Sequence, residues 1–383
     1  MRGLARPSAH RPRDALDPKG RFVGYAQFVH QAEFHPGANA ARRVSRYAKW
    51  RLVMMAALPL AVMAARAADG VFYPGAGGPG HGKRIVFLAG DEEYRSEEGL
   101  PMLAKILAAR HGFKCTVLFS INPADGTIDP NVQTNLPGIE ALDAADLCVM
   151  QLRFRELPDD QMRHFVDYFH AGKPIIALRT STHAFYYQRH PQSPYARFGY
   201  LDTNWPGGFG RQVLGQTWVA HHGAHGKEST RGVINPALAD HPILRGVSEI
   251  WGPSDVYAVS QLPGDAQVLV WGQVLAAMDP GSPPVKGPKN DPMMPVVWVR
   301  QYASQNGKRS RIVTTTLGAA VDLENEGLRR LLVNACYWAL GLVNDIPPKA
   351  DVDFMDPYHP SPFGFGTFKK GVKPADLQSL PSK

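Results

Sequence analysis

Short apolar runs alternate with amphipathic stretches through the first half of the chain. The runs are bounded by glycine, proline or polar residues, a pattern typical of buried strands, and they cover 84–89, 114–119, 146–151 and 174–178. Apolar positions recur at helical spacing after Ser96, which can cap a helix, and after Pro158, and the two helices are expected to end at Gly112 and Gly172. Strands that alternate with helices predict a parallel sheet covered on both faces.

The regular pattern stops between 179 and 251, where aromatic, glycine and histidine residues are frequent. Such a long inserted loop region is usually functional. Strands are predicted again at 267–272, 295–302 and 311–317, and Asn306-Gly307 predicts an antiparallel hairpin between the last two. A final helix is predicted over 323–340. The Pro-, Gly- and Phe-rich tail is expected to form an extended strap.

The basic residues are concentrated at the start of the chain. The formal net charge is +8, but residues 1–67 hold 12 of the 42 Lys and Arg and only 3 of the 34 Asp and Glu, which leaves 30 basic and 31 acidic residues in the rest. The folded part is therefore not expected to bind nucleic acid. We expect a leader over 1–67, a linker over 68–83, an α/β domain over 84–345 and a tail over 346–383.

The leader has the features of a secretory signal peptide. Basic residues from Arg42 to Arg51 precede an apolar run, Leu52 to Ala65, and an A-x-A site ending at Ala67. The run is shorter than the roughly 20 residues of a spanning helix, so no permanent membrane anchor is expected. The mature chain is predicted to be periplasmic or secreted.

Export would permit a disulfide among the three cysteines. Cys115 and Cys148 lie in strand-like runs, and Cys336 lies in the last predicted helix. These positions favour free, buried cysteines.

Three histidines lie within five residues, at His221, His222 and His225. They are candidate ligands for a divalent metal, zinc in particular, and candidate proton carriers. Adjacent residues of an extended segment point to opposite sides, so His221 and His222 are not expected to bind one ion together. A third ligand must come from elsewhere in the fold. The alternative is a solvated loop without a chemical role.

Charged residues follow three of the predicted parallel strands. Acids dominate the first exit, 91–98, whereas arginines occupy the other two, at 153–155 and at Arg179. In a flavodoxin-like strand order these exits converge at the carboxyl edge of the sheet, where ligands bind. The alternative is that the charges pair with one another and cap helices.

Several motifs agree in order with one known family. GDEEYRSEEGLP, ALRTSTHAF, ADHPILRG, IWGPSDVY, PVVWVRQY and RIVTTTLGA together resemble the secreted branch of the trehalose-utilisation (ThuA-like) family, over Arg84 to Leu342. The resemblance implies a class I glutamine-amidotransferase-like α/β fold, doubly wound, with a mostly parallel sheet. It also implies a carbohydrate-related role.

The sequence departs from this pattern where chemistry is expected. A glutaminase needs a cysteine after the fourth strand, but Arg179-Thr180-Ser181 stands there, so Cys-dependent amide hydrolysis is excluded. Members of this family often carry histidine at the position that aligns with Arg179 and at the position of Ala319 in Leu317-Gly318-Ala319. This sequence has neither histidine. The histidine cluster, with His183, can supply the missing imidazoles.

These residues predict a protein that binds and transforms a carbohydrate-derived small molecule. His222 or His225 would exchange a proton, Asp91 or Glu92 would be its partner, and Arg179 would hold a carbonyl or carboxylate. Residues expected to contact the substrate are Tyr94, Arg95, Arg153, Ser181, His183, Trp218 and Asp255. A bound metal would give Lewis-acid chemistry instead. A non-catalytic sugar-binding or complex-forming module is the alternative, and a homo-oligomer stays open.

Overall fold

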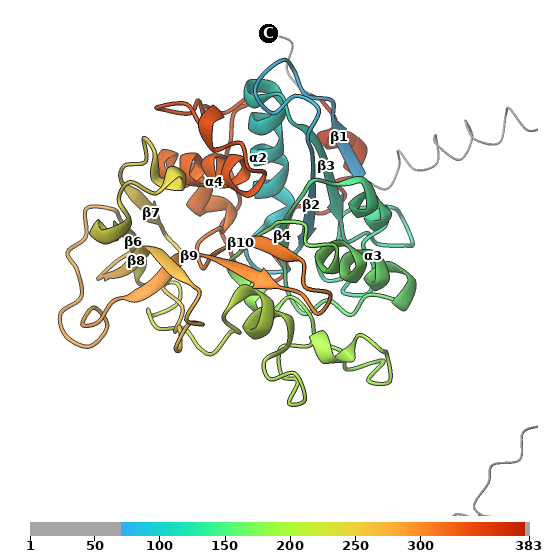
Figure 1. The fold of residues 1–383 in the computed structure, drawn as a ribbon, viewed down its shortest axis with the longest axis horizontal. Coiled ribbons are helices and arrows are strands. Elements are labelled where there is room, and N and C mark those ends of the chain that lie inside the picture. Colours follow the sequence, from blue (N-terminus) through green and yellow to red (C-terminus); the bar gives the residue numbers. More distant parts are fainter. Residues whose placement is uncertain (1–69, 380–383) are drawn as a thin grey trace, which may run out of the picture. The chain divides into compact units, whose positions relative to one another are not determined.

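A ten-stranded sheet crosses the part of the chain that the computed structural model describes, residues 70–379 (Figure 1). The strands run in the order β1-β3-β2-β4-β5-β10-β9-β8-β6-β7. The central strands β3, β2, β4, β5 and β10 are parallel to one another. Strand β1 pairs antiparallel with β3 at one edge, and β9, β8, β6 and β7 continue the sheet beyond β10 in antiparallel pairs. Their bounds are β1 Gly70–Tyr73, β2 Arg84–Gly90, β3 Lys114–Phe119, β4 Leu147–Leu152, β5 Ile175–Leu178, β6 Ser229–Ile234, β7 Ile250–Gly252, β8 Gln267–Leu275, β9 Met294–Ala303 and β10 Arg309–Thr315.

Helices cover both faces of the parallel strands. Helix α2 (Ser96–His111) and helix α4 (Glu326–Ala339) lie on one face, and α3 (Asp159–His170) lies on the other (Figure 1). The four residues of strand β5 are all apolar and all buried. Ile176 and Leu178 pack toward α2 and α4, while Ile175 and Ala177 pack toward α3. A strand buried on both faces has no polar side, so alternation is absent from its sequence.

The four early strands and the first two helices lie where the sequence predicts them. The structure differs from the sequence-based prediction at three short strands and at the start of the last helix. Strand β1 lies inside the span expected to be a linker, and β6 and β7 lie in the segment expected to be loop. Helix α4 begins at Glu326 rather than Leu323, because the Asn325 side chain accepts a hydrogen bond from the Leu328 N–H and caps it.

The tail after Ile346 runs across α2 and the start of α4. It is held by ion pairs of Lys105 with Asp356 (2.6 Å) and of Arg110 with Asp351 (2.6 Å), and by the Tyr358 hydroxyl, which donates to the Ala320 carbonyl. The predicted leader, 1–67, lies outside the described residues. Within 70–379, no helix is both long and apolar enough to span a membrane. The three cysteines are free and buried.

A buried carboxylate fixes the loop that follows β7. Asp322, fully buried in the 3₁₀ turn Ala320–Glu324, accepts hydrogen bonds from the Ser254 N–H (3.0 Å) and hydroxyl (2.6 Å) and from the N–H groups of Gly318 (2.9 Å) and Ala319 (3.0 Å). The chain is thus held in place one residue before Asp255, at the carboxyl edge of the sheet.

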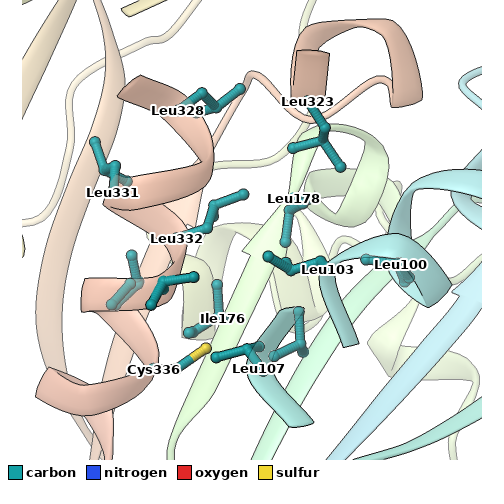
Figure 2. Close-up of a cluster of buried hydrophobic side chains, with 14 of the residues drawn as sticks. Leu100, Leu103, Leu107, Ile176, Leu178, Leu323, Leu328, Leu331, Leu332 and Cys336 are labelled. Carbon is teal, nitrogen blue, oxygen red and sulfur yellow. The ribbon is translucent and has the colours of Figure 1, made fainter. Parts of the chain in front are cut away.

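The core between α2, α4 and β5 sets a stability prediction. Leu332 points into a cluster with Leu103, Leu178 and Leu328 (Figure 2) and is 1% exposed. We expect Leu332→Ala to lower the free energy of unfolding by about 2–5 kcal/mol, because it removes buried methyl groups and leaves a cavity. Urea denaturation would measure it. Leu201→Ala, at a side chain 58% exposed, is the matched control; equal losses in both variants would contradict the assignment of this core.

Candidate functional site

The turn after β2 is organised by Asp91. Its carboxylate accepts hydrogen bonds from the Glu93 N–H (2.7 Å), the Tyr94 N–H and the Thr180 hydroxyl. The Asp91 N–H in turn donates to the Ser96 hydroxyl oxygen, at 3.1 Å. Asp91 is fully buried and its oxygens are occupied. It therefore joins the turns after β2 and β5, and the expected role of Asp91 as proton partner does not fit its contacts.

Unusual backbone conformations mark the three strand exits. Arg95, Phe154 and Arg179, after β2, β4 and β5, have φ values of 61°, 52° and 41°. Residues other than glycine rarely adopt positive φ values, and each such conformation costs on the order of 1 kcal/mol or more of stability. Strain of this kind collects at functional sites, where surrounding contacts maintain it.

Arg179 lies at the centre of the converging exits. Its guanidinium is stacked between the rings of Tyr94 and Tyr257, 4.3 and 4.1 Å from their centroids. It donates to the Asp255 carboxylate (2.9 Å), to the backbone carbonyls of Asp255 (2.9 Å) and Thr316 (2.6 Å) and to the Tyr94 hydroxyl (3.1 Å). The side chain is fully buried. All these partners belong to the protein, so the contacts favour a positioning role for Arg179. Its expected role of holding a substrate carbonyl or carboxylate stays a prediction.

The segment from His221 to His225 meets this cluster at His221 and bends at His222 and Gly223. His221 forms an antiparallel bridge with Tyr257, and the N–H of His222 donates to the Val256 carbonyl at 2.8 Å. The side chains of His221 and His222 have different partners. His221 faces Asp255, whereas the Nε2 of His222 lies 2.9 Å from the Lys289 carbonyl. The structure thus places His222 apart from the site.

Asp255 holds the other two imidazoles. Its carboxylate oxygens lie 2.7 Å from the Nδ1 of His221 and 3.0 Å from the Nδ1 of His225. Burial disfavours the charged carboxylate, but Arg179 and the bonds from the histidines outweigh it and lower the pKa of Asp255 to about 2. An ionised carboxylate can only accept, so each Nδ1 carries the proton. Nε2 is then the atom of His221 that can take a proton or bind a metal.

Glu93 completes the cluster and was not singled out by the sequence. Its Oε1 lies 3.3 Å from the Nε2 of His225, and its Oε2 lies 3.7 Å from Arg153. Burial raises the pKa of Glu93, against the opposing charge of Arg153. The sequence does show three consecutive acids after β2. A difference of one position along the chain determines which of them faces the histidines.

Glu92 faces a different set of partners. Its carboxylate pairs with Arg155 (3.0 Å) and Arg153 (3.1 Å), and Arg155 is fully buried beneath it. Burial raises the pKa of Glu92, against both arginines. The expected catalytic role of Glu92 is not favoured, because its charge is already paired.

A small concave space lies beside the cluster. It has a volume of about 30 Å³, roughly enough for a water or one polar substituent of a ligand. Its walls are Glu93, Arg153, Phe154, His183, Trp218, His221 and Tyr257. Larger cavities lie elsewhere, beside α2 and near Pro158, but the two imidazoles, the facing carboxylates and the strained exits meet here, so we place the candidate site here.

Of the expected substrate contacts, some reach this space and others do not. Arg153, His183 and Trp218 line it directly. The Ser181 hydroxyl donates to the Met150 carbonyl and is buried. Arg95 points to the tail, where it donates to the Gly364 carbonyl and the Thr367 hydroxyl. Ser181 and Arg95 therefore support the fold around the site.

The C-terminal tail forms one rim of the site. The ring of Phe363 lies 5.5 Å from the ring of Tyr94 and 5.3 Å from that of His225, and the Gly364 N–H donates to the Glu93 carbonyl at 2.8 Å. Phe365, 60% exposed, lies against the Arg153 guanidinium. The strap predicted over 346–383 thus brings aromatic rings to the histidines, a contact that the sequence alone did not suggest.

The trehalose-utilisation (ThuA) family model matches residues 84–339. The chain belongs to the ThuA family. The family is one of trehalose utilisation, which suggests a carbohydrate-related function. Two solved structures described as ThuA-like proteins are similar: one from Parabacteroides merdae (14% identity, TM-score 0.44, covering 67% of this chain and 90% of that one) and one from Bacteroides uniformis (16%, 0.43, 69% and 93%). No curated protein matches.

The buried Arg179 predicts a large loss of stability on substitution. Arg179→Met leaves Asp255 buried without its cation, and we expect the free energy of unfolding to fall by about 3–5 kcal/mol. Arg163→Met, which breaks an exposed pair with Asp167, is the control and should cost at most about 0.5 kcal/mol. Urea denaturation of both variants measures the difference. A small loss for Arg179→Met would mean that the guanidinium does not hold the site together.

His183 predicts a pH dependence of stability. Burial, followed by the charges of Arg153, Arg179 and His221, lowers the pKa of His183 well below its ordinary value. The unfolded chain therefore binds a proton that the folded state excludes, and stability falls as the pH drops through the unfolded pKa of about 6.5. Between pH 7.5 and 5.5 this group should cost about 1 kcal/mol.

In His183→Gln this part of the acid-dependent loss should disappear, whereas the exposed control His81→Gln should keep it. Denaturation at the two pH values measures both. Identical pH dependence in the wild type and His183→Gln would contradict the assignment.

Proposed function

We propose that this ThuA protein binds a carbohydrate-derived small molecule beside His221 and transfers protons to and from it. The observation that carries the proposal is the pair of imidazoles held through Nδ1 by one buried carboxylate, Asp255. A carboxylate that fixes the tautomer and direction of an imidazole prepares its other nitrogen for proton transfer. The carbohydrate-related context of the family supplies the substrate class.

The residues take roles that differ in part from those expected from the sequence. The Nε2 of His221 accepts a proton from a hydroxyl or from a carbon next to a carbonyl. His225 and Glu93, 3.3 Å apart, hold the proton that is returned. Arg153, whose charge is shared by Glu92 and Glu93, lies beside the concave space and orients an oxygen of the substrate. Arg179 acts only through Asp255.

The size of the site limits how a sugar can bind. A volume of about 30 Å³ admits one polar substituent and not a whole ring. The rest of the sugar would lie against the rim, where Trp218 and the tail residues Phe363 and Phe365 offer aromatic faces. Aromatic faces suit the apolar face of a sugar, while Arg153 and Glu93 suit its hydroxyl groups.

The chain's other features fit this proposal. The parallel strands follow the order 2-1-3-4-5 when counted along the chain, which supports the amidotransferase-like, doubly wound class. Thr180 and Ser181 follow β5, and Cys115, Cys148 and Cys336 are buried in the core, so a cysteine nucleophile is not part of the mechanism. In this proposal the leader directs the protein out of the cytoplasm.

A second candidate is metal-assisted chemistry. One ligand atom from each of His221, His225 and Asp255 lies within 4.8 Å of the others. Two imidazoles and a carboxylate suit zinc, which would supply Lewis acidity toward a substrate oxygen. His222 does not belong to this set. A binding module without turnover is the third outcome.

The substitution test compares three histidines. We expect His221→Ala to lower kcat/KM by about 10²–10⁴-fold on sugars that carry a ketone, aldehyde or lactone group, because the base is lost. His225→Ala should also be impaired. His222→Ala, one residue away but bonded to the Lys289 carbonyl, should stay within a few-fold of the wild type. Product formation by NMR over a panel of such sugars is the readout; loss in His222→Ala alone would overturn the roles.

Chelation separates the candidates. If proton transfer is metal-independent, as we propose, turnover survives dialysis against EDTA. If zinc is part of the chemistry, EDTA abolishes turnover and zinc restores it in His222→Ala but not in His225→Ala. Ligand-induced thermal stabilisation without turnover of any sugar in the panel would identify a binding module.

A further inference from the structure

A second cavity lies between α2 and the C-terminal tail. Its volume is about 350 Å³, within the range of small-molecule sites. Helix α2 contributes Glu97, Pro101 and Met102, and the tail contributes Met355, Tyr358 and Val372. Most of these side chains are apolar. The cavity therefore offers a space of ligand size with a partly apolar and partly charged wall, separate from the histidine cluster.

Glu97 is the exceptional group in this wall. The residue is 8% exposed, and neither carboxylate oxygen has a hydrogen-bond partner among the described residues. The nearest cation, Arg95, lies 3.8 Å away, beyond hydrogen-bond distance, and donates to the tail instead. Leaving a buried carboxylate without a donor costs several kcal/mol. An unpartnered carboxylate in a cavity wall is therefore a candidate contact for a ligand.

The lysines of the cavity do not pair with Glu97. Two lysines line the cavity, but each is already paired: Lys105 with Asp356 at 2.6 Å and Lys369 with Glu98 at 2.9 Å. Glu98 also keeps one buried oxygen, Oε1, without a partner. The lining carboxylates therefore exceed the ammonium groups by one. An ammonium group of a ligand would supply donors to these oxygens and a positive charge closer to Glu97 than Arg95, which lies 3.8 Å away.

From this geometry we infer that the cavity binds a small organic amine, with its ammonium group on Glu97 and its apolar body between α2 and the tail. This site is distinct from the proposed sugar site and does not depend on it. Burial raises the pKa of Glu97 to about 8, so the empty site tends to hold a neutral carboxyl. An arriving ammonium ion stabilises the ionised form and replaces the missing partner.

Three probes with one carbon skeleton test the charge requirement. Cyclohexylmethylamine, cyclohexylmethanol and cyclohexanecarboxylate are cationic, neutral and anionic at neutral pH. With the full-length protein we expect calorimetry to show one site for the amine, together with a rise in Tm, and little binding of the other two. Equal affinity for the alcohol or the acid would overturn the inference, because the apolar body alone would then decide binding.

Two variants locate the contact. Glu97→Gln keeps the shape of the side chain but removes the charge, and it should weaken amine binding by about tenfold or more. Glu249→Gln, at an exposed glutamate on another part of the surface, should bind as the wild type does. Unchanged amine affinity in Glu97→Gln, with both variants folded by circular dichroism, would contradict the site. Turnover at the histidine cluster, measured separately, reports on the other proposal.

Discussion

The structure of the site depends on one buried cation. The guanidinium of Arg179 has no contact with solvent, so its desolvation must be offset by partners. Its two terminal nitrogens bond to two backbone carbonyls, the Tyr94 hydroxyl and the Asp255 carboxylate, and two tyrosine rings lie against it. These partners come from the exits of β2 and β10 and from the loop after β7. The strained φ of Arg179 is maintained by the same contacts.

The consequence of this arrangement is carried outward through Asp255. Arg179 and His225 share one oxygen of the carboxylate, and His221 contacts the other. Asp322 holds the preceding residue, Ser254, in place, so the carboxylate is fixed from both directions. The tail then encloses the cluster, because Arg95 binds Gly364 and Phe363 lies against His225. The tail is therefore part of the site rather than an accessory to the domain.

Much of the fold follows from the sequence, and much of the site does not. The parallel strands are predictable because residues such as Ile175 and Ile176 must both be buried. The strand Ser229–Ile234 was missed because its burial is incomplete and it has no clean alternation. The choice of His221 over His222 as the residue that faces Asp255 depends on the pairing of His221 with Tyr257, a long-range contact.

The acids after β2 show the same limit. Asp91 and Glu92 are more strongly paired than Glu93, yet all three look alike in the sequence, and only the fold shows that Glu93 faces His225. The most direct test of the account is the tautomer of His221, read from long-range ¹H–¹⁵N correlations of the imidazole rings at neutral pH. We predict that the Nδ1 of His221 carries a proton and donates it to the Asp255 carboxylate. A ring protonated at Nε2 instead would contradict this prediction, because Asp255 would then not hold His221 through Nδ1.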